Sequence, residues 1–396
     1  MKITDVKLDV VRIPRETGFV CEHAFVRLLT DEGITGVGEM SDFSHLPKYA
    51  LDAADLTVTL RRQLVGRDPH ELSALNLELA GLFPETMYYY EKGTFIRCGV
   101  DMALHDLLAK SLGVNVSRLL GGRLRDKIKV CYPIFRHRSV SEVADNLAVV
   151  RSKLEQGFDV FRLYAGVNPD ADEAFLDGVR SEFGSRVTIK SLDYSHLLDW
   201  KPALRITRRL APYDVQLVES PAFRNDVEGL RNFRMAVDLP VSEHVWSFKQ
   251  LSDMIRHDSV DLFNIALIFI GGFEAARKAA AAAEVAGKGV LIGTTQELGY
   301  GTAAQALLGG ALANLNAVSD PTGPYVYTDD VSTEKVRYED GYLLLPELAK
   351  PGIGVEIDWD KVERLKTEGF SWGDQELAQL QDRTRAAKPP GTSVIS

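Results

Sequence analysis

The middle of the chain contains Ile189-Lys-Ser-Leu-Asp193, Gln216-Leu-Val-Glu219 and Leu239-Pro-Val-Ser-Glu-His244. Each apolar stretch ends in a side chain that can bind a metal ion, and these ends lie 26 and 25 residues apart. One strand, one helix and their turns need about 30 residues, so the spacing predicts successive βα units. In a (β/α) barrel, the carboxyl ends of the strands form the active-site face. Carboxylates there favour Mg²⁺, with Mn²⁺ as an alternative.

Length and charge limit the class of protein. The chain has 396 residues, 45% hydrophobic and 26% charged, which fits a barrel plus a second domain. The formal net charge of −10 argues against nucleic acid or an anionic membrane as a partner. An anionic substrate would therefore need a local positive site.

The cysteines and the amino terminus indicate a cytoplasmic protein. Cys21, Cys98 and Cys131 show no metal-binding spacing and are read as reduced, buried thiols. The first fifteen residues, MKITDVKLDVVRIPR, are charged and alternating, unlike a signal peptide. No stretch approaches the roughly 20 apolar residues of a membrane span.

The first third of the chain predicts a small α+β domain. Residues 1–40 alternate as strands do, with a hairpin turn at Asp31-Glu32-Gly33. Residues 46–83 and 93–112 have helical periodicity, and Thr94 is a candidate cap for the second of these helices.

From Lys127 onward, short apolar strands alternate with helical segments, which predicts a parallel sheet long enough to close into a barrel. We therefore expect an α+β domain over residues 1–125 and a (β/α) barrel over 126–365. The tail, 366–396, is expected to pack on the first domain.

This pattern resembles the enolase superfamily, and in particular its muconate-lactonizing branch. The resemblance rests on Leu119-Leu-Gly-Gly-Arg123, on Glu297 in GTTQELGYGTAA, and on the segment from Asp320-Pro-Thr-Gly to Glu356. It implies an α/β fold, a (β/α)7β modified TIM barrel with an α+β capping domain, and an enzyme that is commonly a homo-oligomer. It also implies that Asp193, Glu219 and a third residue bind Mg²⁺.

Departures from the usual pattern narrow the implied activity. The branch normally carries Lys-x-Lys on the second barrel strand, where this chain has Arg162-Leu-Tyr164. The opposing base would fall near Ala266, which cannot take a proton. The third metal ligand aligns with His244, with Glu243 as a one-residue alternative. These features resemble acid-sugar dehydratases of the galactarate dehydratase type.

In that group the Arg–Tyr pair is the base and a tyrosine of the capping domain is the acid, which implies Arg162 and Tyr164, with Tyr90 as the acid. Purely structural roles for these residues are the alternatives. Tyr164 with Arg162 could be a buried structural pair, the tyrosine run that contains Tyr90 could be a packing surface, and single ligands could be helix caps. Trp246 could pack beside His244.

Further residues are candidates for substrate binding. Asp42 and His45 lie in the loop after the first sheet, and could bind sugar hydroxyls or a second cation with Thr295 or Glu297; an exposed loop is the alternative. Any one of the consecutive residues Arg136, His137 and Arg138 could face a distal carboxylate, since arginine binds carboxylates bidentately. Lys190 could contact substrate or point outward.

The function expected from the sequence is a Mg²⁺-dependent dehydratase of a diacid sugar, galactarate first, giving a 2-keto-3-deoxy diacid. The alternatives are a racemase or cycloisomerase of the same branch, and a barrel that binds an acid sugar without chemistry.

Overall fold

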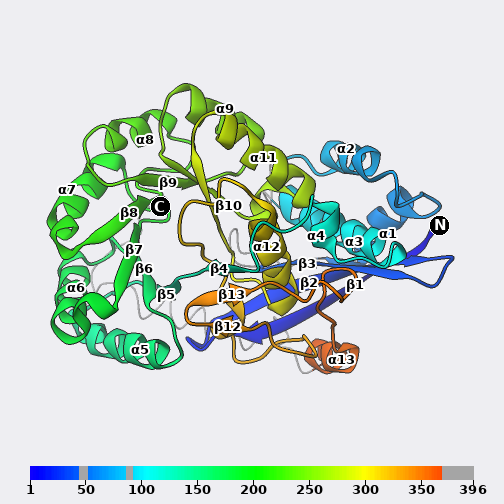
Figure 1. The fold of residues 1–396 in the computed structure, drawn as a ribbon, viewed down its shortest axis with the longest axis horizontal. Helices are drawn as coiled ribbons and strands as arrows, with labels where there is room; N and C mark the ends of the chain where they lie inside the picture. The colour runs from blue at the N-terminus through cyan, green and yellow to red at the C-terminus, as the bar shows by residue number, and fades with distance from the viewer. Residues whose placement is uncertain (44–51, 86–91, 368–396) are drawn as a thin grey trace, which may run out of the picture.

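The computed structural model describes residues 1–43, 52–85 and 92–367. It consists of a cap built on an antiparallel sheet and a barrel-like domain built on a parallel sheet, as the sequence predicted (Figure 1). Within the described ranges, every helix is too short or too polar to span a bilayer.

The cap sheet is a meander of β1 (Ile3–Pro14), β2 (Val20–Thr30) and β3 (Thr35–Met40), and the predicted hairpin turn joins its last two strands. Its helices are α1 (Ala53–Leu64), α2 (Leu72–Leu82), α3 (Gly93–Ser111) and the short α4 (Val116–Leu119). The helical region expected over 46–83 is therefore interrupted, because Gly66 has φ +84° and Pro69 follows it. The prediction that Thr94 caps the second helix was wrong: the cap position is Lys92, and Thr94 lies buried inside α3.

Seven parallel strands form the second sheet, and each strand lies beside the strands that precede and follow it in the chain. They are β5 (Tyr132–Ile134), β6 (Val160–Tyr164), β7 (Thr188–Asp193), β8 (Val215–Glu219), β9 (Val241–His244), β10 (Leu262–Ile265) and β11 (Gly289–Ile292). Most of their side chains are buried, as expected for a parallel sheet covered on both faces.

Helices alternate with these strands, and Figure 1 shows α5 to α9 as an outer arc around the sheet. The helices of this domain are α5 (Val143–Glu155), α6 (Pro169–Phe183), α7 (Trp200–Leu210), α8 (Val227–Arg234), α9 (Phe248–Arg256), α10 (Leu267–Ile270), α11 (Phe273–Val285) and α12 (Gly299–Ala311). Single 3₁₀ turns occur at Val140–Glu142, Gly184–Arg186, Ala211–Tyr213 and Gly323–Tyr325.

Residues 315–319 take the place of the eighth strand. Leu315 forms a parallel bridge to Val290 on β11, and Ser319 forms one to Val130, just before β5. The backbone N–H of Cys131 donates to the carbonyl of Ser319 at 2.9 Å. The two edges of the seven-stranded sheet are thus joined through one irregular segment.

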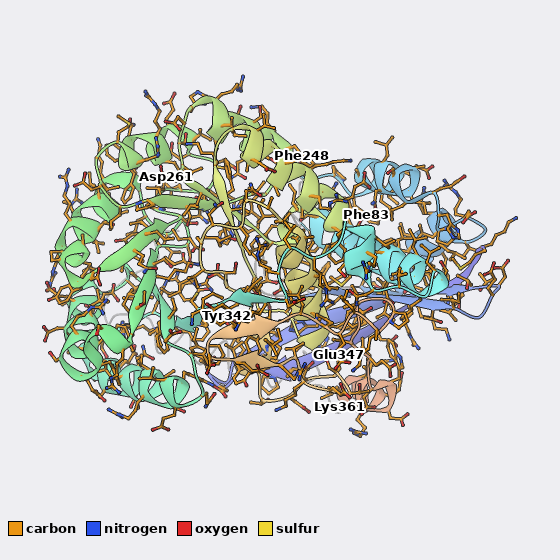
Figure 2. The ribbon with its side chains drawn as sticks, in the orientation of Figure 1. Phe83, Phe248, Asp261, Tyr342, Glu347 and Lys361 are labelled. Carbon is orange, nitrogen blue, oxygen red and sulfur yellow. The ribbon has the colours of Figure 1, made fainter. Side chains whose placement is uncertain are left out.

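The carboxy-terminal part of the chain returns to the cap. A second small sheet joins β12 (Tyr338–Glu339) and β13 (Tyr342–Leu344) to β4 (Lys127–Lys129). Helix α13 (Trp359–Thr367) packs on β1, and Lys366 Nζ donates to Asp9 Oδ1 at 2.8 Å. Figure 2 shows Tyr342, Glu347 and Lys361 on the side of the molecule where the cap strands lie. Residues 368–396 of the predicted tail lie outside the described ranges, and the domain boundaries stay a prediction.

Glu39, near the end of β3, joins the cap to the barrel. Its carboxylate accepts hydrogen bonds from the backbone N–H groups of Leu298 at 2.9 Å and Gly301 at 2.7 Å, at the start of α12. His23 Nδ1 lies 2.9 Å from the same carboxylate. A carboxylate at a helix amino terminus satisfies donors that have no partner within the helix.

Strand β3 can lie close to α3 only because it carries glycine at two positions. A Cβ on Gly38 would stand 1.9 Å from the carbonyl oxygen of Gly99, and one on Gly36 would stand 2.2 Å from that of Ala103. Backbone atoms on both elements leave no room for a side chain to adjust. The contact between sheet and helix therefore fixes these residues as glycine.

We expect Gly38→Ala to lower the free energy of unfolding by at least about 2 kcal/mol, since the added methyl group forces α3 away from the sheet. Urea unfolding followed by circular dichroism measures the change. The control is Gly81→Ala in α2, where a Cβ meets nothing within 4 Å; there alanine should be neutral or stabilising. Equal stability of the two variants would contradict the close-packing interpretation.

Candidate active site

The carboxyl ends of the barrel strands open into a cavity of about 290 Å³ that both domains line. The cap contributes Arg15, Asp42, Lys92 and Phe95, and the barrel contributes residues from β5 to the loop after β11. The volume is near the lower end of the range for ligand pockets, about 300–1,000 Å³, which suits a small molecule. This is the face on which the sequence placed the site.

The three predicted metal ligands end consecutive strands. Asp193, Glu219 and His244 are the last residues of β7, β8 and β9, and all three are buried. His244 Nε2 lies 3.1 Å from Glu219 Oε1. Glu243 instead accepts from His196 Nε2 at 2.7 Å and from Ser220 Oγ at 3.1 Å. The structure thus groups His244, rather than Glu243, with the two carboxylates, while metal binding itself stays a prediction.

The donor set fits a divalent cation. Glu219 Oε2 and His244 Nδ1 are buried without a hydrogen-bond partner, although buried polar atoms are normally satisfied. The two carboxylates match the preferences of Mg²⁺ or Mn²⁺, and an imidazole nitrogen is a further donor for a divalent cation. Within the described ranges, however, no three acidic, histidine or cysteine side chains converge on one point. Binding a cation would therefore require these side chains to move together.

Arg162 and Tyr164, at i and i+2 on β6, project to the same face. Arg162 Nη2 donates a hydrogen bond to Tyr164 Oη at 2.7 Å. Tyr164 pairs in register with Asp193 on β7. Arg162 Nη1 lies 3.8 Å from Asp193 Oδ2 and 3.6 Å from Glu219 Oε1. The predicted base pair thus lies directly beside the predicted metal ligands.

Burial and charge act in opposite directions on these groups. Burial raises the pKa of Tyr164, Arg162 lowers it, and Asp193 and Glu219 raise it. The net pKa is about 12. Burial also works to raise the pKa of Glu219, but Lys190, His244 and Arg162 outweigh it, so that this carboxyl's pKa is lowered. Glu219 is therefore ionised, while Tyr164 without a bound cation is neutral at pH 7.

Lys190 lies beneath the cavity rather than in its wall. Its Nζ donates to Asp320 Oδ1 at 2.5 Å and lies 3.6 Å from Glu219 Oε2. Asp320 also lies 3.5 Å from Arg162 Nη1 and accepts from Asn264 Nδ2 at 3.2 Å. Asp320 was not among the site residues predicted from the sequence. The available signal in the sequence was an acidic residue directly after the segment 315–319, which takes the place of the eighth strand.

Of the three consecutive candidates after β5, only Arg136 lines the cavity. His137 is buried away from it, with Nδ1 3.1 Å from Asp172 Oδ1 and Nε2 bonded to Asn146. The side chain of Arg138 is exposed, and its backbone N–H donates to Glu142. The structure therefore does not support contact between Arg138 and a ligand in this cavity.

Some of the candidates in the loops line the cavity, and others do not. Asp42 lines it and accepts from Arg15 Nη2 at 3.1 Å. Thr295 lines it and lies 2.6 Å from Ser41 Oγ. Glu297 does not line it, because its carboxylate accepts from Thr294, Thr295 and Gln305. His45 and Tyr90 lie outside the described residues.

The sequence reasoning also missed His196. Its ring lines the cavity, 6.4 Å from that of His244 between centroids. Ser195 and His196 have φ of +47° and +60°, which non-glycine residues rarely adopt. Ser195 is held by two hydrogen bonds to Asp193, and His196 by its bond to Glu243. Trp246 lines the cavity beside His244, as expected.

Comparison with protein families identifies the fold. The Enolase C-terminal domain-like family matches residues 145–361, more than half of the chain. The chain belongs to the enolase superfamily. The amino-terminal domain of the mandelate racemase / muconate lactonizing enzyme family matches residues 3–121. The expected superfamily is therefore confirmed, at the level of the mandelate racemase / muconate lactonizing enzyme family.

Relatives that match this chain include racemases, epimerases and cycloisomerases. The N-succinyl-L-Arg/Lys racemase of Bacillus cereus is 26% identical over 92% of this chain and 98% of its own. A muconate cycloisomerase of Acinetobacter lwoffii is 27% identical over 86% and 87%. The L-Ala-D/L-Glu epimerase of Bacillus subtilis is 26% identical over 90% and 97%.

Solved structures of superfamily members agree in fold. The Bacillus cereus racemase has a TM-score of 0.82 at 24% identity, covering 92% of this chain and 98% of its own. Muconate cycloisomerase from Pseudomonas fluorescens has a TM-score of 0.81 at 26% identity, with the same coverage. The names of these relatives favour an isomerase and do not support the expected likeness to galactarate dehydratases.

We expect Arg162→Met to lower the free energy of unfolding at pH 7 by about 3–5 kcal/mol, because Lys190 alone then remains to offset the charge of the buried carboxylates. In the wild type the pKa of Glu219 is lowered, so its stabilising contribution is present above the unfolded-state pKa and is lost only at acidic pH. Without the guanidinium the carboxyl pKa values rise, and protonation relieves the repulsion. The deficit should therefore shrink from pH 7 to pH 5.

Urea unfolding at the two pH values tests this expectation. The matched control is Arg151→Met, which removes an exposed ion pair with Glu182 and should cost less than about 1 kcal/mol at either pH. A deficit for Arg162→Met that grows as the pH falls would contradict the interpretation.

Proposed function

We propose that this protein is a Mg²⁺-dependent acid-sugar dehydratase, with galactarate as the first substrate to test. Tyr164 removes the proton α to a carboxylate, and the β-hydroxyl then leaves as water. The α C–H bond and the β C–O bond break, a C=C bond forms, and the resulting enol tautomerises to a 2-keto-3-deoxy acid. The observation that carries the proposal is the 2.7 Å hydrogen bond between Arg162 and Tyr164 in the cavity wall.

Asp193, Glu219 and His244 would hold the metal ion. When bound, Mg²⁺ supplies a Lewis acid at the substrate carboxylate, which neutralises the charge that develops there. Mn²⁺ would serve in the same way.

The energetics of Tyr164 explain why its surroundings matter. With a pKa of about 12, ionisation at pH 7 costs about 7 kcal/mol, at about 1.36 kcal/mol for each pH unit. Arg162 stabilises the phenolate by donating directly to its oxygen. Arg136 also lowers the pKa of Tyr164, and a metal ion held beside it at Asp193 would lower this pKa further. The acid that protonates the leaving hydroxyl is, by the family pattern, Tyr90.

Chemistry on one face of the substrate favours elimination over two-base racemisation. At the end of β10, opposite β6, Ala266 is buried and carries no titratable group. In the described part of the chain, the residues lining the cavity from the loops after β10 and β11 are Phe269, Thr294, Thr295 and Gln296. These side chains do not exchange protons near pH 7.

A racemase or cycloisomerase is the second candidate, favoured by the names of the relatives at 26–27% identity. A cycloisomerase needs an acid or base on only one face of its substrate, so Ala266 weighs less against it than against a racemase. A barrel that binds an acid sugar without turnover remains as an outcome of the experiments below.

A panel of mono- and diacid sugars, assayed with Mg²⁺ and with semicarbazide as the reagent for 2-keto acids, tests the activity. We expect a 2-keto-3-deoxy product from galactarate or a close diacid. Running the reaction in D₂O separates the candidates, because deuterium in recovered substrate without product indicates racemisation. Binding without product or exchange would leave only a binding protein.

We expect Tyr164→Phe to lose most of kcat while retaining Mg²⁺ binding, since the change removes only the base. Below the pKa of Tyr164 in the loaded enzyme, kcat should rise about tenfold for each pH unit, because the active form is deprotonated. Stopped assays across pH and calorimetric titration with Mg²⁺ measure both. The control is Tyr338→Phe, a half-buried tyrosine outside the cavity that donates to the carbonyl of Pro321. Normal turnover by Tyr164→Phe would remove the mechanism.

A further inference from the structure

The cavity is positively charged within an acidic protein. Among the described residues, five cationic side chains line it against two carboxylates: Arg15, Lys92, Arg136, Arg162 and Arg224. The whole chain has a net charge of −10. A local reversal of sign in a concave site concentrates ligands of negative charge. The occupant of this cavity is therefore expected to be an anion.

Arg136 differs from the two arginines of the cavity that form ion pairs in its wall. Arg15 is paired with Asp42, and Arg162 lies within 4 Å of three carboxylates. In the described ranges Arg136 has no carboxylate within that distance, and its Nε and Nη2 are buried without a hydrogen-bond partner. Buried guanidinium donors left in this state cost free energy, and a ligand oxygen would satisfy them.

Aromatic rings hold the Arg136 guanidinium without using its donors. The guanidinium carbon lies 4.9 Å from the centre of the Tyr164 ring, and Phe135 stacks on Tyr164 at 5.8 Å. A cation over a ring face is attracted by the π-system and keeps its N–H groups for other partners. Because two of these donors form a planar fork, a carboxylate is the ligand that fits them best.

The position of Arg136 sets the distance to the rest of the site. It follows β5, Tyr164 ends β6 and Asp193 ends β7, and these strands are neighbours. Two strand spacings, about 10 Å, separate the end of β5 from the end of β7. A six-carbon chain with one carboxylate at β7 to β9 crosses in front of Tyr164 and points its other end toward β5, where the arginine side chain reaches inward.

We propose that Arg136 binds the second carboxylate of a dianionic substrate and so selects diacids over monoacids. The inference rests on the proposed function for the position of the first carboxylate. It assigns the specificity-determining group to one residue of this chain. The exposed neighbour Arg138 has no part in it.

The test measures binding rather than turnover. Calorimetric titration of the Mg²⁺-loaded Tyr164→Phe protein compares galactarate with galactonate, in which CH₂OH replaces one carboxylate. We expect the diacid to bind at least about tenfold more tightly, in line with a charge-assisted bidentate pair. Adding Arg136→Gln should weaken the diacid about 10- to 100-fold and change the monoacid by less than about threefold.

Two further variants complete the design. Arg136→Lys keeps the charge but loses the planar fork, so it should retain only part of the preference. Arg138→Gln removes the same charge from the exposed position two residues away and should leave the preference intact. Unchanged monoacid binding shows in each case that the site is folded.

Several outcomes would overturn the proposal. A parent protein without preference for the diacid, or one that binds neither acid, has no second carboxylate site. Equal weakening of both ligands by Arg136→Gln makes Arg136 a support for Tyr164 rather than a ligand contact. Loss of preference in Arg138→Gln moves the site to that residue. A preference for the diacid that depends on Arg136, in a wild-type enzyme that dehydrates no acid sugar, would sink the proposed function alone.

Discussion

The site is organised by a buried arginine among buried acids. Arg162 lies between Asp193, Glu219 and Asp320, with Lys190 below, and still donates to Tyr164. Without the guanidinium, these carboxylates would repel one another in a medium that screens them poorly. Arg162 also helps to lower the pKa of Glu219, one of the residues proposed to bind a metal ion. The same residue thus balances the charge of the barrel centre and activates the proposed base.

The sequence predicted most of the fold because the candidate site residues lie at the carboxyl ends of the predicted barrel strands. The regular spacing from Asp193 to His244 placed the ligands on one face, and the i, i+2 spacing paired Arg162 with Tyr164. Contacts between distant segments could not be read in this way. Asp320 meets Lys190 across 130 positions, and Glu243 turns to His196, a residue no motif singled out. The consecutive residues after β5 gave three candidates, and only the path of the backbone after that strand selects Arg136.

The names of the relatives favour an isomerase, whereas the proposed function from the site is that of a lyase. Racemases and cycloisomerases of this superfamily share the fold over nearly their whole length. This chain has its cavity at the carboxyl ends of the strands, and buried Ala266 follows β10. A site with one base can take a proton from a single face of its substrate, whatever leaves afterwards. The difference between isomerase and lyase then depends on the groups that face the β-carbon.

The contact through Glu39 has a consequence for descent. A cap carboxylate that fills the amino terminus of a barrel helix ties two segments more than 250 positions apart in sequence. Recombination that exchanged one domain for that of a distant relative would break this match unless both halves travelled together. The cap, which supplies Arg15 and Asp42 to the cavity wall, is therefore expected to be inherited with its own barrel. New specificities in such a lineage would arise by substitution within the loops rather than by exchange of domains.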